Sequence, residues 1–312
     1  MKEIAMRDAF LDKLYRIAKK DHRIILISAD FGAPSLDKFR RDMSDQFINV
    51  GIAEQNMISI AAGVALSGKI VFCYAIAPFI TMRCYEQIRI DLCCMNLPVT
   101  LVGVGAGYGY DDSGPTHHTL EDIAVMRALP NMTILNASDS VMAEAFAEIA
   151  YKSPGPKYVR LDRTKHCFNR GDHDFQTGMA EMIHGKDLKI IATGYMVSQA
   201  LAVHGELQHA DVHPGIVDLY RIKPLNKELL RQVVDKAKAI ITLEENFIHG
   251  GIGSIVAELL ADTRKQVPLK RLGIPDMYSF RYGGRKKLHE DCGLDVDSIA
   301  KSILKWVKEI KC

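Results

Sequence analysis

A glutamate at the start of an apolar helix is the first residue in this chain that could do chemistry. The run 47–50 reads as the end of a strand, and apolar residues recur at helical spacing after Gly51, which places Glu54 near a helix start. A carboxylate there complements the helix dipole and needs no other role. The apolar neighbours Ile52, Met57, Ile58 and Ile60 would bury it. Because burial raises the pKa of a carboxyl group toward neutrality, Glu54 is also a candidate for proton exchange.

A second group of reactive side chains lies at residues 111–118. It contains Asp111, Asp112, Ser113, His117 and His118. Carboxylates and imidazoles bind metals, but adjacent histidines do not easily point at one ion, and no further ligand spacing follows. The sequence therefore disfavours a metal site and predicts no metal ligand in this chain.

Alternating glycines precede that group, at positions 103, 105, 107 and 109. The spacing is not Gly-x-Gly-x-x-Gly, and no Lys-Ser or Lys-Thr follows, so neither a dinucleotide site nor a P-loop is indicated. Glycines at alternate positions do allow a backbone to approach a ligand closely. We expect a loop that combines close backbone approach with the side chains of residues 111–118.

Helix and strand patterns alternate around these residues. Helices are expected at 4–19, from Glu54, from Pro78 and at 141–151; strands are expected at 24–29, 69–74, 97–104, from Asn131 and at 158–163. Ser138 and Asp139 are good capping residues for the helix at 141–151. This pattern predicts an α/β domain with a parallel sheet and with ligand contacts in the loops that follow the strands.

A second α/β unit follows a stretch without periodicity. The expected organisation is a parallel-sheet domain at 1–165, a linker at 166–186 and a smaller α/β domain at 187–312. Strands are expected at 188–193, 215–218 and 239–243, and helices at 198–209 and 226–236. The run Gly250-Gly251-Ile252-Gly253-Ser254 opens a further helix, whose amino end could bind an anion.

The composition excludes several classes of function. The 312 residues have a net charge of +2 with acids and bases interspersed, which gives no electrostatic case for nucleic acid or anionic membranes. The seven cysteines show no Cys-x-x-Cys spacing, as expected of reduced thiols. The amino terminus lacks a signal-peptide core, and no apolar run could span a bilayer. We expect a soluble cytoplasmic protein.

The string Val50-Gly51-Ile52-Ala53-Glu54-Gln55-Asn56 resembles a family signature. It is similar to the Gly-Ile-(Ala or Arg)-Glu-(Gln or His) motif of the thiamine-diphosphate enzymes of the transketolase and deoxyxylulose-phosphate-synthase group. In that family the glutamate hydrogen-bonds the aminopyrimidine ring of the cofactor and promotes proton removal from its thiazolium ring. The resemblance assigns Glu54 this catalytic role and makes Ile52 a cofactor-binding residue.

Two further segments resemble the same family. Residues 79–89 look like the aromatic helix of two-chain prokaryotic transketolases, which makes Phe79 and Tyr85 candidates for stacking on the cofactor pyrimidine. Gly114-Pro115-Thr116-His117 matches the Asp-Gly-Pro-Thr-His motif, whose histidine lies beside the cofactor and the donor sugar. His117 is therefore a catalytic and substrate-binding candidate. Ser113 replaces the aspartate of that motif, and Gly105 falls where transketolases have another substrate-binding histidine.

The resemblance also implies a site for the substrate phosphate. The loop 30–35 is similar to the Ala-Asp-Leu-x-x-Ser segment of transketolases, in which the serine and an arginine near the domain start hold the phosphate; the matching residues are Ser35 and Arg7. Arg163, at the end of the strand 158–163, matches an arginine that grips the phosphate as a planar fork. With Ser113 and His117, these are the expected substrate-binding residues.

The family binds its metal through a Gly-Asp-Gly motif, and this sequence has none. The resemblance covers the pyrimidine-binding and carboxyl-terminal domains of the family, and implies the carboxyl-terminal subunit of a two-chain transketolase. An amino-terminal partner subunit would bind the diphosphate of thiamine diphosphate through Mg²⁺ or Ca²⁺, and a dimer of heterodimers would bind a sugar phosphate.

Three alternative functions remain open at this point. The β subunit of a 2-oxo-acid dehydrogenase E1 component shares the glutamate signature and the two-domain layout, although Gly-Pro-Thr-His and Arg163 argue against it. A deoxyxylulose-phosphate-synthase-like activity fits Arg83 and the Gly-Ile-Ala-Glu-Gln string, but that enzyme is normally one chain. A non-catalytic binding or scaffolding subunit is disfavoured because Glu54, Phe79, His117 and Arg163 occur together.

Overall fold

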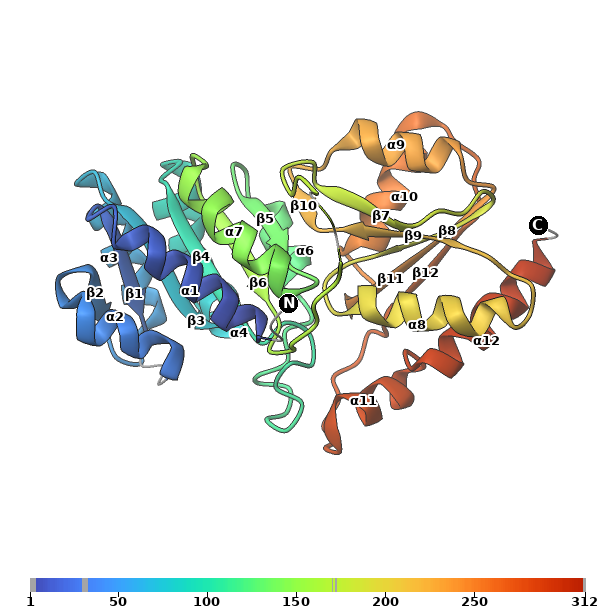
Figure 1. Ribbon diagram of the computed structural model, residues 1–312, viewed down its shortest axis with the longest axis horizontal. Coiled ribbons are helices and arrows are strands. Elements are labelled where there is room, and N and C mark those ends of the chain that lie inside the picture. Colours follow the sequence, from blue (N-terminus) through green and yellow to red (C-terminus); the bar gives the residue numbers. More distant parts are fainter. Residues whose placement is uncertain (1–3, 30–32, 170, 172, 311–312) are drawn as a thin grey trace.

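Two β-sheets organise the chain, each in its own α/β lobe, as Figure 1 shows. The computed structural model describes residues 4–29, 33–169, 171 and 173–310. Strands β1, β4 and β6 are buried along their whole length. Burial on both faces is typical of parallel strands that are covered by helices on either side.

The first sheet has the strand order β10-β5-β6-β4-β3-β1-β2 within the described residues. Its strands are β1 (Ile24–Ser28), β2 (Phe47–Asn49), β3 (Ile70–Ile76), β4 (Val99–Val104), β5 (Thr133–Asn136), β6 (Lys157–Leu161) and β10 (Arg221–Lys223). All neighbouring pairs are parallel except β10 with β5. The carboxyl ends of β1, β2, β3, β4 and β6 therefore meet at one edge of the sheet.

Helices cover both faces of this sheet. They are α1 (Met6–Ala18), α2 (Asp37–Asp42), α3 (Glu54–Leu66), α4 (Ala77–Thr81), α5 (Tyr85–Gln87), α6 (Asp122–Ala128) and α7 (Ser140–Lys152), with the 3₁₀ helices η1 (Pro34–Leu36) and η2 (Ser44–Gln46) and the π-helix η3 (Ile88–Cys94). Helices α1 and α7 lie side by side on one face (Figure 1), where Phe10, Leu14 and Phe146 are fully buried. Helices α3 and α6 bury apolar residues in the core on the other face.

The second sheet has the order β12-β11-β8-β9-β7 in the described part of the chain. Its strands are β7 (Met179–Ile183), β8 (Leu188–Ala192), β9 (Gly215–Leu219), β11 (Ala239–Phe247) and β12 (Leu269–Ile274), and its helices are α8 (Met196–Gln208), α9 (Lys227–Asp235), α10 (Ile252–Thr263), α11 (Gly284–Cys292) and α12 (Val296–Glu309). Helices α8 and α12 lie below this sheet and α9 above it in Figure 1. None of the helices in the described ranges is both long and apolar enough to cross a membrane.

The predicted two-domain α/β architecture is confirmed. Asp139 caps α7 as predicted, accepting a hydrogen bond from the Met142 N–H at 2.7 Å. Two details differ from the expected layout. Strand β7 lies inside the range 166–186 that we expected to be a linker, because it pairs antiparallel with β9. Strand β10 leaves the second lobe and joins the first sheet, so the two lobes interlock.

The amino end of α10, where an external anion seemed possible, is filled by a side chain of the protein itself. The Glu244 carboxylate accepts hydrogen bonds from the backbone N–H groups of Ile252 at 2.8 Å and Gly253 at 2.9 Å. Glu244 is 1% exposed, and its burial raises the pKa to about 7 although these N–H groups and nearby Arg160 and Arg271 oppose the shift. The helix end is therefore capped internally.

We predict that Glu244→Gln changes how stability depends on pH. The folded pKa of about 7 lies above the ordinary 4.5, so the folded state binds more protons between these values, and the stability contribution falls as pH rises from about 4.5 to 7. Relative to the glutamine variant, the wild-type chain should lose roughly 3 kcal/mol across this window. Urea unfolding at several pH values measures the difference. Parallel stability curves for the two proteins would contradict the prediction.

Candidate active site

The predicted site residues come together at the carboxyl edge of the first sheet. Glu54 follows β2, Phe79 follows β3, His117 follows β4 and Arg163 follows β6. Because these strands run parallel, the segments that leave them lie next to one another. The parallel sheet thus gathers side chains that are far apart in sequence.

Glu54 is buried at the first turn of α3. Its side chain is 5% exposed and pairs with Arg83, whose guanidinium donates to Oε2 at 2.8 Å. Met57 and Ile58 are fully buried as expected. The expectation that Ile52 also shields Glu54 is wrong, because Ile52 is 79% exposed in the turn that precedes the helix.

Arg83 connects Glu54 to an aromatic group. Its guanidinium carbon lies 4.1 Å from the centre of the Phe79 ring, and its side chain is 44% exposed. A cation over an aromatic face is a favourable arrangement. Arg83 was noted in the sequence only for its family resemblance, since nothing in the spacing indicates that it pairs with Glu54.

A row of rings continues from Phe79 across the loop that follows β4. Phe79 and His117 meet edge to face at 5.1 Å between ring centres, and His117 lies 5.9 Å from Tyr110. The Nδ1 atom of His117 is 2.9 Å from the Thr116 hydroxyl, which orients the imidazole. His117 therefore lies where we predicted, between the glutamate end of the site and the arginine end.

Arg163 ends this row. Its guanidinium lies 4.5 Å from the centre of the Tyr110 ring, and its Nη1 donates to the Gly109 carbonyl at 3.2 Å. Its exposed side chain is free to meet a ligand. Arg7, in the first turn of α1, pairs with Asp8 at 2.7 Å, and its charge acts on the phenols of Tyr74 and Tyr110. Arg7 and Arg163 thus bring positive charge to the same end of the site.

Three other predicted residues have different surroundings. The Ser35 hydroxyl is buried and makes no hydrogen bond within the described part of the chain; residues 30–32 of its loop lie outside that part. The Ser113 hydroxyl donates to Asp112 at 3.0 Å. Tyr85 is not part of the row of rings, because its hydroxyl donates to the Val125 carbonyl at 2.9 Å and its ring packs against the core.

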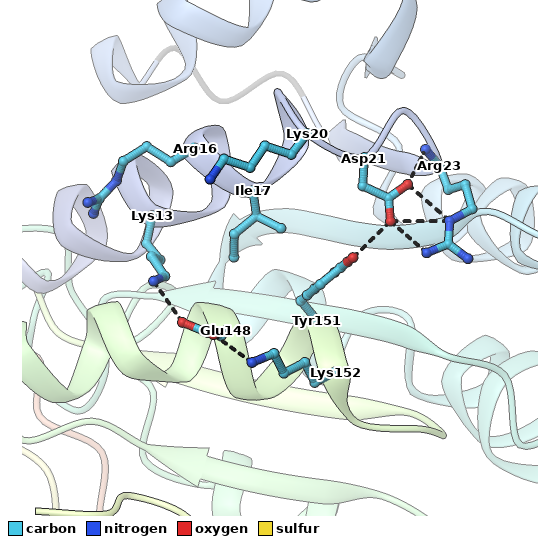
Figure 2. A pocket seen from close by; sticks show the side chains of 9 residues that line it. All are labelled: Lys13, Arg16, Ile17, Lys20, Asp21, Arg23, Glu148, Tyr151 and Lys152. Carbon is cyan, nitrogen blue, oxygen red and sulfur yellow. Dashed lines mark hydrogen bonds and ion pairs between the residues drawn. The ribbon is translucent and has the colours of Figure 1, made fainter.

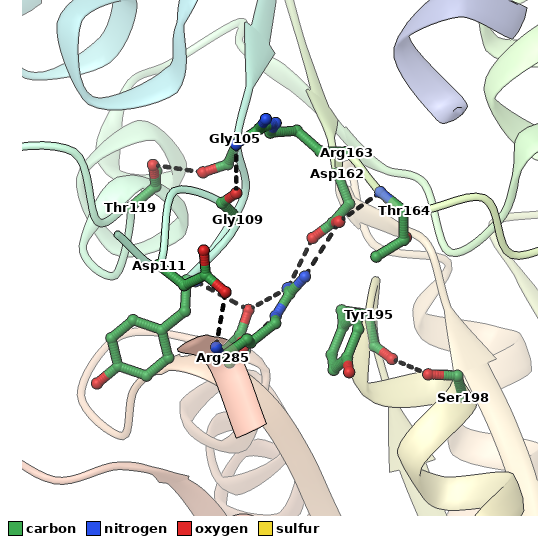
Figure 3. Close-up of polar contacts among 12 residues, drawn as sticks. Gly105, Gly109, Asp111, Thr119, Asp162, Arg163, Thr164, Tyr195, Ser198 and Arg285 are labelled. Atoms are coloured by element: carbon green, nitrogen blue, oxygen red, sulfur yellow. Dashed lines mark hydrogen bonds and ion pairs between the residues drawn. The ribbon is translucent and has the colours of Figure 1, made fainter. Parts of the chain in front are cut away.

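The second lobe holds the histidine loop through a buried ionic cluster, shown in Figure 3. Arg285 of α11 donates to both Asp162 oxygens, at 3.1 and 2.6 Å, and to both Glu245 oxygens, at 2.8 and 2.5 Å. The backbone N–H of Arg285 also donates to Asp111 at 2.7 Å. His289 hydrogen-bonds Glu245 as well. The cluster therefore joins the end of β6, the loop after β4 and the second lobe.

The electrostatics of the cluster favour charged groups despite burial. Burial alone would raise the pKa of Glu245, but Arg285 and His289 hold it well below its ordinary range. Burial alone would lower the pKa of Arg285, and Asp162 and Glu245 keep it well above normal. The loop also fits closely: a Cβ atom at Gly107 would lie 1.7 Å from Glu245 Oε2, so a side chain at position 107 would clash with the cluster. None of these pairings has a sequence signal, since Glu245 and Arg285 lie in different elements.

A cavity of about 620 Å³ lies at the opposite edge of the first sheet, between α1 and α7 (Figure 2). Arg23 and Lys152 line it from the segments that precede β1 and β6. Its charges largely neutralise one another: Glu148 pairs with Lys13 at 2.7 Å and with Lys152 at 2.6 Å. This cavity is therefore separate from the candidate site.

Comparison with known proteins identifies the family. Residues 2–167 match the family model for the transketolase pyrimidine binding domain, and residues 178–299 match that for the transketolase C-terminal domain. The chain belongs to the transketolase family. One of the two subunits of an apulose-4-phosphate transketolase from Phocaeicola vulgatus is 35% identical over 310 residues, with 98% of each chain covered.

Other transketolase relatives differ in how much of their length is matched. A split-gene transketolase solved as an inactive β4 tetramer superimposes with a TM-score of 0.87 and 31% identity, covering 97% of this chain and 98% of that one. A 1-deoxy-D-xylulose-5-phosphate synthase of Caldanaerobacter subterraneus is 33% identical over 312 residues, but this chain spans 49% of it. The chain therefore corresponds to one whole subunit of the split enzymes and to half of the synthase.

Proposed function

We propose that this chain is the carboxyl-terminal subunit of a two-chain transketolase. With an amino-terminal partner it transfers a two-carbon ketol unit from a ketose to an aldose. The observation that supports this most strongly is the end-to-end similarity to the apulose-4-phosphate transketolase subunit, together with coverage of only half of the single-chain synthase. The grouping of Glu54, Phe79, His117 and Arg163 at one sheet edge is consistent with a catalytic role.

The residues around Glu54 fit an aminopyrimidine ring. The Arg83 guanidinium is planar and carries N–H donors, as such a ring does. It lies over Phe79 at 4.1 Å and donates to Glu54 at 2.8 Å. The guanidinium thus stands in for a flat nitrogen-bearing ring, and shows that Phe79 and Glu54 can together contact one group through its face and its edge. Arg83 is 44% exposed and can move aside.

Thiamine diphosphate, when bound, supplies a nucleophilic ring carbon for the transfer. Glu54 would hold the aminopyrimidine edge, Phe79 its face, and the exposed Ile52 would contact the cofactor where the partner closes over it. Tyr85 supports the helix that carries Phe79, instead of stacking as expected. His117 is oriented by Thr116 to hold or move a proton at a sugar oxygen through Nε2.

The other half of the site would come from the partner subunit. This sequence has no Gly-Asp-Gly motif, so we assign the diphosphate and its Mg²⁺ or Ca²⁺ to the partner. We expect a dimer of heterodimers in the cytoplasm. Arg7, Arg163, Ser35 and Ser113 would bind the sugar, with the two arginines at the end that carries a phosphate or a similar anion.

A deoxyxylulose-phosphate-synthase-like reaction is the second candidate. The similarity to the Caldanaerobacter synthase and the presence of Arg83 favour it. That reaction uses pyruvate as donor and releases carbon dioxide, whereas ketol transfer does not. Incubating the assembled enzyme with pyruvate and an aldose phosphate separates the two, because carbon dioxide release would support the synthase.

The experiment that tests the proposal is reconstitution. We predict that the purified chain alone shows no ketol transfer with thiamine diphosphate and Mg²⁺, whereas adding the partner restores transfer from a ketose phosphate to an aldose phosphate. A coupled assay for the new aldose measures this. Full activity of the single chain would contradict the split-enzyme proposal, and so would a lack of transfer by the pair with every ketose tested.

A further inference from the structure

Tyr110 and Gly105 form a pair that the sequence did not indicate. A Cβ atom at Gly105 would lie 2.2 Å from two carbons of the Tyr110 ring, so the ring fills the space that a side chain at position 105 would need. Gly105 also has φ +90°, which disfavours any other residue. The tyrosine is therefore seated against the backbone at the start of the histidine loop.

The neighbours of the Tyr110 ring are all candidate site residues. Arg163 lies on its face at 4.5 Å, and His117 meets it at 5.9 Å. Burial raises the pKa of its phenol, while the charges of Arg163 and Arg7 act in the opposite direction. A raised phenol pKa leaves the hydroxyl protonated at neutral pH, and such a group donates a hydrogen bond.

The hydroxyl of Tyr110 is available to a ligand. Within the described ranges it makes no hydrogen bond to the protein, and it is absent from the buried unpaired groups there, so solvent reaches it. Two arginines act on it electrostatically, and no carboxylate does so measurably. A half-buried donor beside two guanidinium groups matches a ligand oxyanion.

We propose that Tyr110 is a specificity-determining residue whose hydroxyl donates to the terminal anion of the sugar, between Arg7 and Arg163. This rests on the proposed function and extends it. The ligand class is a sugar with a phosphate or similar oxyanion at the end remote from the transferred carbons. The ring has a separate role, because it supports Arg163 through its face.

Tyr110→Phe tests the hydroxyl alone, since phenylalanine keeps the ring on Gly105 and under Arg163. In the assembled enzyme we expect KM for fructose 6-phosphate to rise roughly 10- to 100-fold, as for a lost hydrogen bond to a charged group, with KM for fructose unchanged. Tyr15→Phe is the matched control, because its hydroxyl donates to Asp42 at the protein surface, and it should leave both KM values unchanged.

A binding measurement separates this inference from the proposed function. Inorganic phosphate titrated calorimetrically into the pair without cofactor should bind at least several-fold more weakly to the Tyr110→Phe variant. Equal phosphate affinity of the two proteins would overturn the inference, and so would an equal rise in KM for fructose and fructose 6-phosphate. If the wild-type pair transfers no ketol unit, the proposed function fails, while weaker phosphate binding by the variant would still support Tyr110.

Discussion

Replacing Glu54 by glutamine is expected to lower ketol transfer by the assembled enzyme about 10³-fold, within the range for loss of a positioned acid–base group. Glutamine has nearly the same shape, so it keeps the packing of the buried position in α3, where the side chain is 5% exposed. It cannot take up a proton or hold a negative charge. The affinity for thiamine diphosphate should fall much less than the rate, because Phe79 and the partner subunit still bind the cofactor.

The control for this variant is Glu86→Gln. Glu86 lies on α5, is 63% exposed and pairs with Arg89 at 2.7 Å, so its loss removes a carboxylate from the surface without touching the site. Its rate should match the wild-type rate. A Glu54→Gln enzyme that keeps more than a tenth of the wild-type rate would remove Glu54 from the catalytic role.

Replacing Arg285 by methionine is expected to destabilise the chain by about 3–5 kcal/mol, the usual cost of removing one partner from a buried ion pair. Arg285 neutralises Asp162 and Glu245, whose side chains are 1% and 3% exposed, and both would remain buried without it. The loop would also lose its contact through Asp111. Urea unfolding measures the destabilisation, and limited proteolysis at residues 105–118 reports on release of the loop.

Arg281→Met is the matched control in the same segment. The Arg281 side chain is 73% exposed and pairs with Asp291 at 3.3 Å, so its removal should cost less than about 1 kcal/mol. Equal stability of the two variants would show that the cluster does not hold the lobes together. If the Arg285 variant does not fold, Asp111→Asn gives the same loop readout while leaving Arg285 paired with Glu245.

The sequence was sufficient for the architecture because the strands have a strong local pattern. Apolar, β-branched runs such as 24–28 and 99–104 are bounded by polar residues or turns, and the helices between them predict parallel order. The edge strands β7 and β10 were missed. Each is short, partly exposed and held by pairing with a strand distant in sequence, which local periodicity does not reveal.

The candidate site was predictable only where a motif existed. Glu54 and His117 lie inside recognisable strings, and the structure brings both to the same sheet edge. Tyr110 and Arg285 depend on contacts across the fold, so no spacing marks them. Ile52 was misjudged because apolar character favours burial, whereas a turn with Gly51 at φ +73° turns this residue toward solvent.

The exchange rate of the thiazolium C2 hydrogen of thiamine diphosphate, followed by NMR in deuterium oxide, tests most directly whether Glu54 acts on a cofactor held by another chain. Four samples are needed: this chain, the partner, the pair, and the pair with Glu54→Gln. We predict fast exchange only in the wild-type pair. Equally fast exchange with the partner alone, or with the variant pair, would contradict a site completed by Glu54.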